Sequence, residues 1–233
     1  MTSAHRENYT PGRTQAISFL VLHYTAGRND SARGNVRYFA ENAVRASAHY
    51  FVDEKGWVQS VDDGDTAWSV GTAGVYRQKH PLCRNANSIS IELCCRFQAG
   101  AYSFAPQTVQ NAVRLVQLLM ARYQIPVQNV LRHYDVVSKR CPAPWVEDET
   151  AWEAFLKQVG KEQDMTKEEL FSLDGTGDAP SAWAREATAW ARARGLMLGD
   201  GKGNFGWQTP VTREMLAAVL QRLAQKQPEG KQD

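Results

Sequence analysis

The sequence lacks the features that mark several classes of protein. No apolar run approaches the roughly 20 residues of a transmembrane helix, and the first ten residues have no apolar core like that of a secretory signal. Lys and Arg total 27 against 25 Asp and Glu, and the net charge of +2 is too weak to imply a nucleic-acid partner. We therefore expect no membrane insertion, no nucleic-acid partner, and storage in the cytoplasm until the protein is released.

Cysteine is scarce as well. Cys83, Cys94, Cys95 and Cys141 are irregularly spaced, which favours a reducing compartment over a disulfide framework. Adjacent Cys94 and Cys95 would point to opposite faces of a strand, so we expect buried free thiols there. The length of 233 residues and the hydrophobic content of 43% predict one globular domain with a small second module.

Hydrophobic patterning predicts alternating strands and helices over residues 1–160. Strands are expected at 17–23, 47–53, 57–61, 88–95 and 127–133, and helices at 31–43, 106–123 and 145–159. A loop rich in Gly and Asp covers 62–86. Residues 161–177 form a polar linker in this interpretation, and two more helices are expected after it, over 180–194 and after a cap at Thr212.

Three side chains that suit a metal ion stand at or near the ends of predicted strands. His23 and His133 each end a strand, and Cys141 follows eight residues after His133. Imidazole and thiolate both bind zinc, and a catalytic zinc site typically has three protein ligands and an open position for water. A lone histidine at a strand end is more often structural, but two of them with a nearby thiol favour a zinc site.

Hydrolysis at a zinc ion also needs a base and a positive group for the oxyanion. Glu92 lies on a predicted strand whose other face is aliphatic, and Lys139 stands two residues before Cys141. The alternatives are an exposed charge on an edge strand for Glu92 and a solvated loop lysine for Lys139. Together with the ligands, they predict a base and an oxyanion-stabilising cation.

Four segments in order resemble a known family. They are LVLHYTAG at 20–27, SAHYFV at 47–52, NSISIEL at 87–93 and HYDVVSKRCP at 133–142. Together they resemble the zinc-dependent type 2 N-acetylmuramoyl-L-alanine amidases, a group that includes phage endolysins and shares its fold with peptidoglycan recognition proteins. The resemblance covers about 18–156. It implies an α/β catalytic domain over 1–160, with a central mixed β-sheet flanked by helices.

The same resemblance implies the chemistry of the site. A zinc ion would be held by His23, His133 and Cys141, and the reaction would hydrolyse the amide between N-acetylmuramic acid and L-alanine in peptidoglycan. Glu92 would act on the attacking water, and Lys139 would steady the tetrahedral intermediate. Relatives that only recognise peptidoglycan typically lack the cysteine, so Cys141 favours an enzyme.

The chain departs from this family pattern at two places. Some relatives have a catalytic tyrosine one position before Tyr50, where this chain has His49, and these two neighbours lie on opposite strand faces. Many relatives have a histidine after the tryptophan of the Ala-Trp loop, where this chain has Ser69. We therefore expect Trp68, by stacking, and at most one of His49 and Tyr50 to bind substrate.

Residues 178–226 resemble a single S-layer homology repeat. The segments that carry this resemblance are WAREA at 183–187, GLMLGDG at 195–201 and TPVTRE at 209–214. It implies binding to a secondary cell-wall polymer, with Arg213 meeting the anionic chain. Such repeats usually act in sets of three, so wall binding by a single copy would require oligomerisation of the chain through the repeat. The alternative is a two-helix appendage packed on the enzyme.

The resulting hypothesis is a phage or prophage endolysin for host lysis, a bacteriolytic zinc amidase that acts on the bacterial cell wall. One alternative is a peptidoglycan-binding protein without catalysis, whose zinc is structural or absent. A second alternative is a cytoplasmic amidase that recycles muropeptides, which would have no use for a wall-targeting module.

Overall fold

We describe the protein from a computed structural model. The structure describes residues 3–161, 184–198, 205, 207 and 213–226. The chain divides into two compact units, Met1–Thr166 and Lys167–Asp233, and each is described by itself. Residues 162–177 of the predicted linker and 178–183 of the predicted second module lie outside the described residues.

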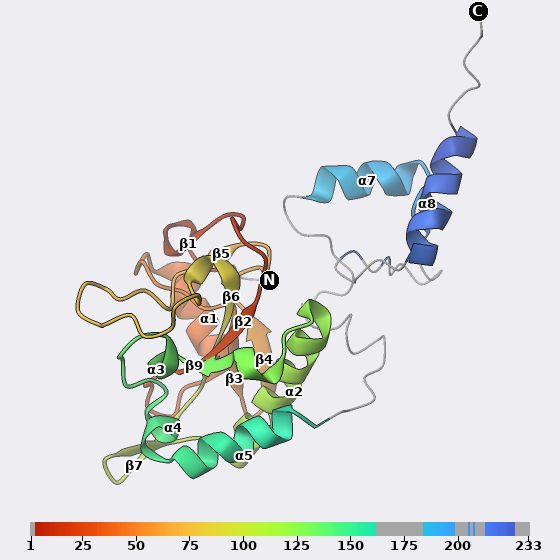
Figure 1. Ribbon diagram of the computed structural model, residues 1–233. Coiled ribbons are helices and arrows are strands. Elements are labelled where there is room, and N and C mark those ends of the chain that lie inside the picture. Colours follow the sequence, from red (N-terminus) through yellow and green to blue (C-terminus); the bar gives the residue numbers. More distant parts are fainter. Residues whose placement is uncertain (1–2, 162–183, 199–204, 206, 208–212, 227–233) are drawn as a thin grey trace, which may run out of the picture. The chain divides into compact units, whose positions relative to one another are not determined.

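A five-stranded mixed sheet forms the centre of the first unit (Figure 1). The strand order is β4-β3-β6-β2-β9. Strands β3, β6, β2 and β9 are parallel, and β4 pairs antiparallel with β3 at one edge. The bounds are Phe19–Tyr24 for β2, Tyr50–Asp53 for β3, Gly56–Gln59 for β4, Ser88–Leu93 for β6 and Val130–Arg132 for β9. The expected α/β fold with a central mixed sheet is confirmed.

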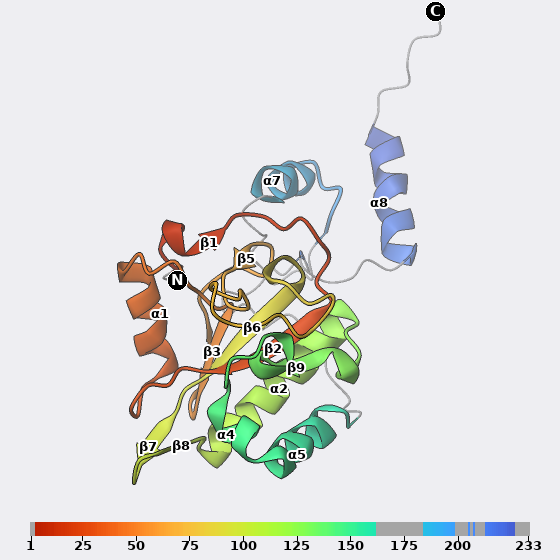
Figure 2. The same cartoon turned by 60° about the vertical axis from the view of Figure 1, so that its left-hand side comes forward.

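Helices cover both faces of this sheet (Figure 2). On one side lies α1, Ala32–Glu41, which begins where the Ser31 hydroxyl accepts a hydrogen bond from the Gly34 amide. On the other side lie α2, Pro106–Tyr123, and α5, Glu149–Val159. The bounds of α2 are those that its apolar stripe predicts, because one continuous buried face packs on the sheet.

Two predicted elements are broken where polar groups cap a helix. The expected strand 127–133 is a 3-10 turn, η3, at Val127–Asn129 followed by β9, and His133 begins the short helix α3, His133–Val136. The Asp135 carboxylate accepts the Arg132 backbone N–H at 2.9 Å, which starts that helix. The expected helix 145–159 is α4, Ala143–Glu147, followed by α5, because Asp148 caps α5 by accepting the Ala151 amide at 3.0 Å.

Smaller elements frame the sheet. Strands β1, Tyr9–Thr10, and β5, Thr66–Ala67, form one antiparallel pair, and β7, Arg96–Gln98, and β8, Ala101–Ser103, form a hairpin. Two further 3-10 turns are η1, Arg6–Asn8, and η2, Asn85–Asn87. All four cysteines are free and buried, as predicted for Cys94 and Cys95. Within the described ranges, no helix is long and apolar enough to cross a membrane.

The second unit contains two described helices, α7, Arg185–Ala193, and α8, Arg213–Lys226. Between them, the backbone carbonyl of buried Leu196 accepts a hydrogen bond from Arg222 Nη1 at 3.0 Å. This contact ties the segment after α7 to α8. The predicted cap Thr212 lies outside the described residues.

Candidate metal centre

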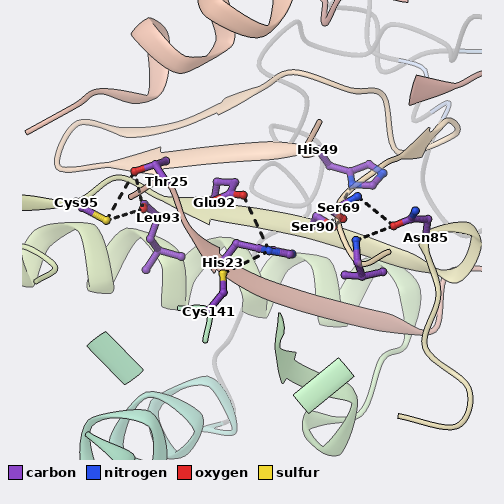
Figure 3. Close-up of polar contacts among 11 residues, drawn as sticks. His23, Thr25, His49, Ser69, Asn85, Ser90, Glu92, Leu93, Cys95 and Cys141 are labelled. Carbon is purple, nitrogen blue, oxygen red and sulfur yellow. Dashed lines mark hydrogen bonds and ion pairs between the residues drawn. The ribbon is translucent and has the colours of Figure 1, made fainter. Parts of the chain in front are cut away.

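The structure brings the three predicted metal ligands together. His23 comes from β2, His133 begins α3, and Cys141 lies in the loop before α4. All three are buried, and their ligand atoms lie within 4.8 Å of one another. Cys141 Sγ is 3.8 Å from His23 Nδ1, and the two imidazole rings have centres 4.5 Å apart. Figure 3 shows the Cys141 sulfur directed at the His23 ring.

The sheet explains why residues so far apart in sequence meet. Parallel strands end at the same edge of a sheet, and ligands of α/β proteins bind outside those carboxyl ends. The loop that follows β9 is held in place by backbone hydrogen bonds. Tyr134 N donates to the Cys141 carbonyl at 2.8 Å, and Val137 N donates to the His133 carbonyl at 2.9 Å. These bonds return Cys141 to the histidine at the start of α3.

The orphaned ring nitrogens fit a metal ion. His23 Nε2 and both ring nitrogens of His133 are buried without a hydrogen-bond partner, although buried polar atoms are normally paired. Burial lowers the pKa of both rings, to about 3 for His133, so both are neutral and able to coordinate at neutral pH. Two imidazoles and a thiol are a donor set that zinc accepts. The residues therefore fit the predicted metal.

Glu92 stands beside this group on the central strand β6. It is the register partner of His23 across the parallel pair, so both side chains occupy one face of the sheet. Its Oε1 lies 4.0 Å from His23 Nδ1, and its Oε2 is buried without a partner. Burial raises the pKa of Glu92 to about 7, against the opposing effect of Lys139. Because β6 lies between β3 and β2, the alternative of an exposed edge-strand charge is excluded.

Lys139 is partly buried in the loop between α3 and Cys141. Its positive charge contributes to lowering the pKa of His23, His133 and Glu92, which sets its ammonium within electrostatic range of all three. Its Nζ also lies 5.8 Å from the centre of the Tyr76 ring.

Backbone pairing fixes the chain next to Lys139. Ser138 N donates to the Arg77 carbonyl at 2.8 Å, and Arg77 N donates back to Ser138 Oγ at 2.8 Å. Lys79 N donates to the Val136 carbonyl at 2.9 Å. The part of the Gly- and Asp-rich loop around Arg77 is thus fixed to the segment that carries Lys139.

His49 and Tyr50 lie inside the protein, both with 0% exposure. His49 Nδ1 accepts the Ser90 amide at 2.9 Å, and Arg13 Nη2 lies 2.6 Å from His49 Nε2. The Tyr50 hydroxyl accepts from Gln59 Nε2 at 3.1 Å. Both side chains are covered in this structure, and the expected contact of one of them with substrate stays a prediction. Figure 3 draws His49 away from the metal ligands, beside Ser90.

Trp68 and its neighbour Ser69 are only partly buried. The indole of Trp68 donates its N–H to Thr10 Oγ1 at 2.9 Å, which leaves its ring face as the part available for stacking. Ser69, which stands where many relatives have histidine, has its hydroxyl hydrogen-bonded to Ser90 and its amide donated to Asn85.

Sequence reasoning missed two neighbours of the site. Asp30 raises the pKa of Glu92, and its carboxylate accepts the Cys95 amide at 2.9 Å. Tyr24 follows His23, and its backbone N–H opposes the rise that burial causes in the pKa of Cys141. No spacing rule identifies either residue, because each acts through a partner at least 60 residues away in the chain.

An α/β fold with a buried His-His-Cys group at the carboxyl edge of its parallel strands defines a class of metal-binding proteins. Residues 13–144 match the model of the Amidase_2 family, described as N-acetylmuramoyl-L-alanine amidase. The match covers more than half of the chain. The chain belongs to this family.

Individual relatives agree with that assignment. The N-acetylmuramoyl-L-alanine amidase CwlL of Bacillus licheniformis is 35% identical over 156 residues, which cover 64% of this chain and 42% of the relative. BlyA of Bacillus subtilis, also an N-acetylmuramoyl-L-alanine amidase, is 33% identical over 160 residues, covering 64% of this chain and 43% of the relative. The chain thus spans less than half the length of these relatives.

Solved structures share the fold. PlyL superposes with a TM-score of 0.55 at 28% identity, covering 66% of this chain and 91% of PlyL. A mutant endolysin from Bacillus subtilis also gives a TM-score of 0.55 at 26% identity, covering 68% and 96%.

Proposed function

We propose that the protein is a zinc-dependent N-acetylmuramoyl-L-alanine amidase that hydrolyses the amide between N-acetylmuramic acid and L-alanine in peptidoglycan. The observation that carries the proposal is the buried group of His23, His133 and Cys141 with Glu92 beside it. Family membership supports the choice of bond. A binding module would have no need for unpaired ligand atoms next to a carboxylate of raised pKa.

His23, His133 and Cys141 would hold the zinc ion. When bound, zinc supplies a Lewis acid that polarises the scissile carbonyl and lowers the pKa of a water molecule. The nitrogen atoms without partners in the described structure support this role.

Glu92 acts as the general base and then as the general acid. It takes a proton from the attacking water and gives it to the amine nitrogen of L-alanine as the carbon–nitrogen bond breaks. The water oxygen ends in the new carboxyl group of the muramic acid lactyl arm. A pKa of about 7 suits both directions of transfer, because proton transfer is most efficient when the pKa is close to the working pH.

Lys139 stabilises the negative charge that develops on the carbonyl oxygen. Its ammonium lies within electrostatic range of Glu92 and both histidines. A fixed positive group in a partly buried site acts more strongly there than in water, because water screens it less.

Mass spectrometry of digested peptidoglycan tests the function directly. Purified protein should release peptides with a free L-alanine amino terminus and leave glycan free of peptide, and a chelator should stop this release until zinc is restored. The recognition-only alternative predicts binding to cell walls that survives chelation, with no released peptide. Absence of such peptides with zinc present would overturn the proposal.

The biological setting that we favour is an endolysin, held in the cytoplasm and acting on the bacterial cell wall at lysis. The likeness to an endolysin from Bacillus subtilis supports this setting. An amidase that recycles muropeptides shares the chemistry, so the two are separated by comparing intact walls with soluble muropeptides. Preference for soluble fragments would favour recycling.

We also propose that the second unit is a wall-targeting module of the S-layer homology type. Its supports are the two helices α7 and α8, the Arg222–Leu196 tie and the exposed Arg213 at the start of α8. The predicted loop residues 199–204 lie outside the described residues. Full-length protein should sediment with walls that retain their secondary polymer, less so as Arg213→Ala, and as an oligomer if repeats associate. A monomeric protein that does not bind the polymer would favour the alternative, a two-helix appendage packed on the enzyme.

A further inference from the structure

A row of three aromatic side chains runs from the metal centre onto the β7–β8 hairpin. The rings of Tyr24 and Tyr102 meet edge to face with centres 5.4 Å apart, and Tyr102 lies 4.8 Å from Phe97. All three side chains are partly exposed. We call Tyr24, Tyr102 and Phe97 the aromatic row.

The aromatic row begins next to the reacting groups. Tyr24 follows His23 along β2, so its ring stands at the same end of the strand as that residue, on the other face of the sheet. The other two rings belong to β7 and β8, which follow the carboxyl end of β6 where Glu92 lies. In Figure 2 this hairpin projects from the sheet beyond the ends of β3 and β6. The aromatic row and Glu92 thus lie toward the same end of the central strands.

The hairpin is tied to the rest of the domain. Phe97 N donates to Asn29 Oδ1 at 3.3 Å. Arg96 makes two hydrogen bonds to Glu54 Oε1, at 2.7 and 3.2 Å, from the base of the hairpin to the β3–β4 turn. A tethered row loses less conformational entropy on binding than a loose one.

Arg28 adds a positive charge at the outer end of the row. Its guanidinium carbon lies 4.7 Å from the centre of the Phe97 ring, and its side chain is exposed. Within the part of the chain that the structure describes, no carboxylate lies within ion-pair distance of Arg28, whereas Arg96 pairs with Glu54 and Arg140 with Glu147. A guanidinium stacked by its face keeps its N–H donors free along its edge.

We infer that the aromatic row is a subsite for the stem peptide, and that Arg28 binds a carboxylate of that peptide. The inference rests on the proposed amidase function. It states which of the two parts of the substrate, the glycan or the stem peptide, the hairpin binds. Charge decides between the two sides. The muramic acid carboxyl is consumed in the scissile amide and the neighbouring sugar is neutral, whereas the stem peptide carries free carboxylates. The planar guanidinium edge matches a carboxylate with two parallel hydrogen bonds.

Two soluble muramoyl peptides test this inference, one with free stem carboxylates and one with the same carboxylates amidated. For the free acid, Arg28→Gln should raise KM about tenfold with kcat within about twofold, since a charged hydrogen-bonded pair is lost. For the amidated peptide, Arg28→Gln should leave KM unchanged. Phe97→Leu removes the stacking surface and should raise KM for the free acid as well.

Arg96→Gln is the matched control, because Arg96 lies on the same hairpin but is already paired with Glu54. It should change KM by the same factor for both peptides, because loosening the tie to Glu54 does not distinguish a carboxylate from an amide. Thermal unfolding verifies that each variant is folded. An equal effect of Arg28→Gln on both peptides, or no effect on either, overturns the subsite while the amidase function stands. If the zinc-loaded wild type cleaves neither these peptides nor intact walls, the proposed function fails, and the subsite fails with it.

Discussion

Glu92 and His23 are register partners across the parallel strands β6 and β2, with Glu92 Oε1 4.0 Å from His23 Nδ1. The proposed base and one metal ligand are thus held by backbone pairing in the middle of a sheet. Sites built on strands are more precise than sites built on loops. This relationship allows the base to be removed without disturbing the ligand.

Glu92→Gln should retain zinc and lose catalysis. The amide has nearly the shape of the carboxylate but cannot accept a proton, so kcat should fall about 10²–10⁴-fold. Peptide release measures the loss, and metal analysis of the purified variant measures zinc. Loss of zinc in this variant would mean that Glu92 supports the metal centre rather than the proton transfer.

Metal removal should destabilise the first unit in the wild type but not in Cys141→Ala. A ligand that binds the folded state alone stabilises it by about 2.7 kcal/mol when its free concentration is 100 times the dissociation constant. A chelator should therefore lower the unfolding temperature of the wild type and leave that of Cys141→Ala unchanged. The reverse pattern would exclude Cys141 as a ligand.

Lys139→Met should lower kcat by about 10²–10³-fold with little change in KM, because the ammonium acts on charge that develops in the transition state. The chain offers a control in Lys79, whose Nζ lies 3.5 Å from the centre of the Tyr134 ring in the adjoining loop. Lys79→Met should keep kcat within about twofold of the wild type. Equal losses in both variants would point to loop packing instead.

Acid should destabilise the fold through buried His49. Burial, with the nearby Arg13 charge, holds the pKa of His49 well below its usual 6.5, so the folded state keeps the ring neutral. Below pH 6.5 the unfolded chain takes up a proton that the folded chain does not, and stability falls by up to about 1.4 kcal/mol per pH unit.

Urea unfolding in the presence of chelator at several pH values measures that slope. Buried His23 and His133 contribute in the same direction, whereas the carboxyls of Glu92 and Asp63, whose pKa values burial raises, contribute in the opposite direction. The wild type should therefore show a net loss of stability below pH 6.5. In His49→Gln one fewer proton is taken up on unfolding, so the loss of stability per pH unit should be smaller by up to about 1.4 kcal/mol. An unchanged slope would show that His49 titrates alike in both states.

Periodic patterns predicted the frame well. The bounds of α2 follow from its unbroken apolar stripe, and the alternation along 88–95 placed Glu92 opposite the aliphatic face. His23 and Cys141 are 118 residues apart, and their grouping came from strand ends and ligand chemistry, since His23 and His133 each end a predicted strand and Cys141 follows His133.

Other features could not be predicted from local pattern. Alternation predicts that His49 and Tyr50 lie on opposite faces of their strand, but it does not predict that both faces are covered and that both side chains are buried. The stacking of Arg28 on Phe97 depends on how a hairpin folds back against a distant loop, which no spacing encodes. Asp148 caps the start of α5, so the helix that periodicity predicts over 145–159 is divided at this residue.

The parallel register of β2, β6 and β9 also bears on how the metal centre arises during folding. Neighbouring strands in this part of the sheet are far apart in sequence, so their pairing closes long loops and is slow compared with helix formation. His23, His133 and Cys141 share no coordination site until that pairing is complete. Zinc uptake should therefore be a late event that reports the finished sheet, and a partly folded chain should bind zinc no better than scattered histidines and thiols do.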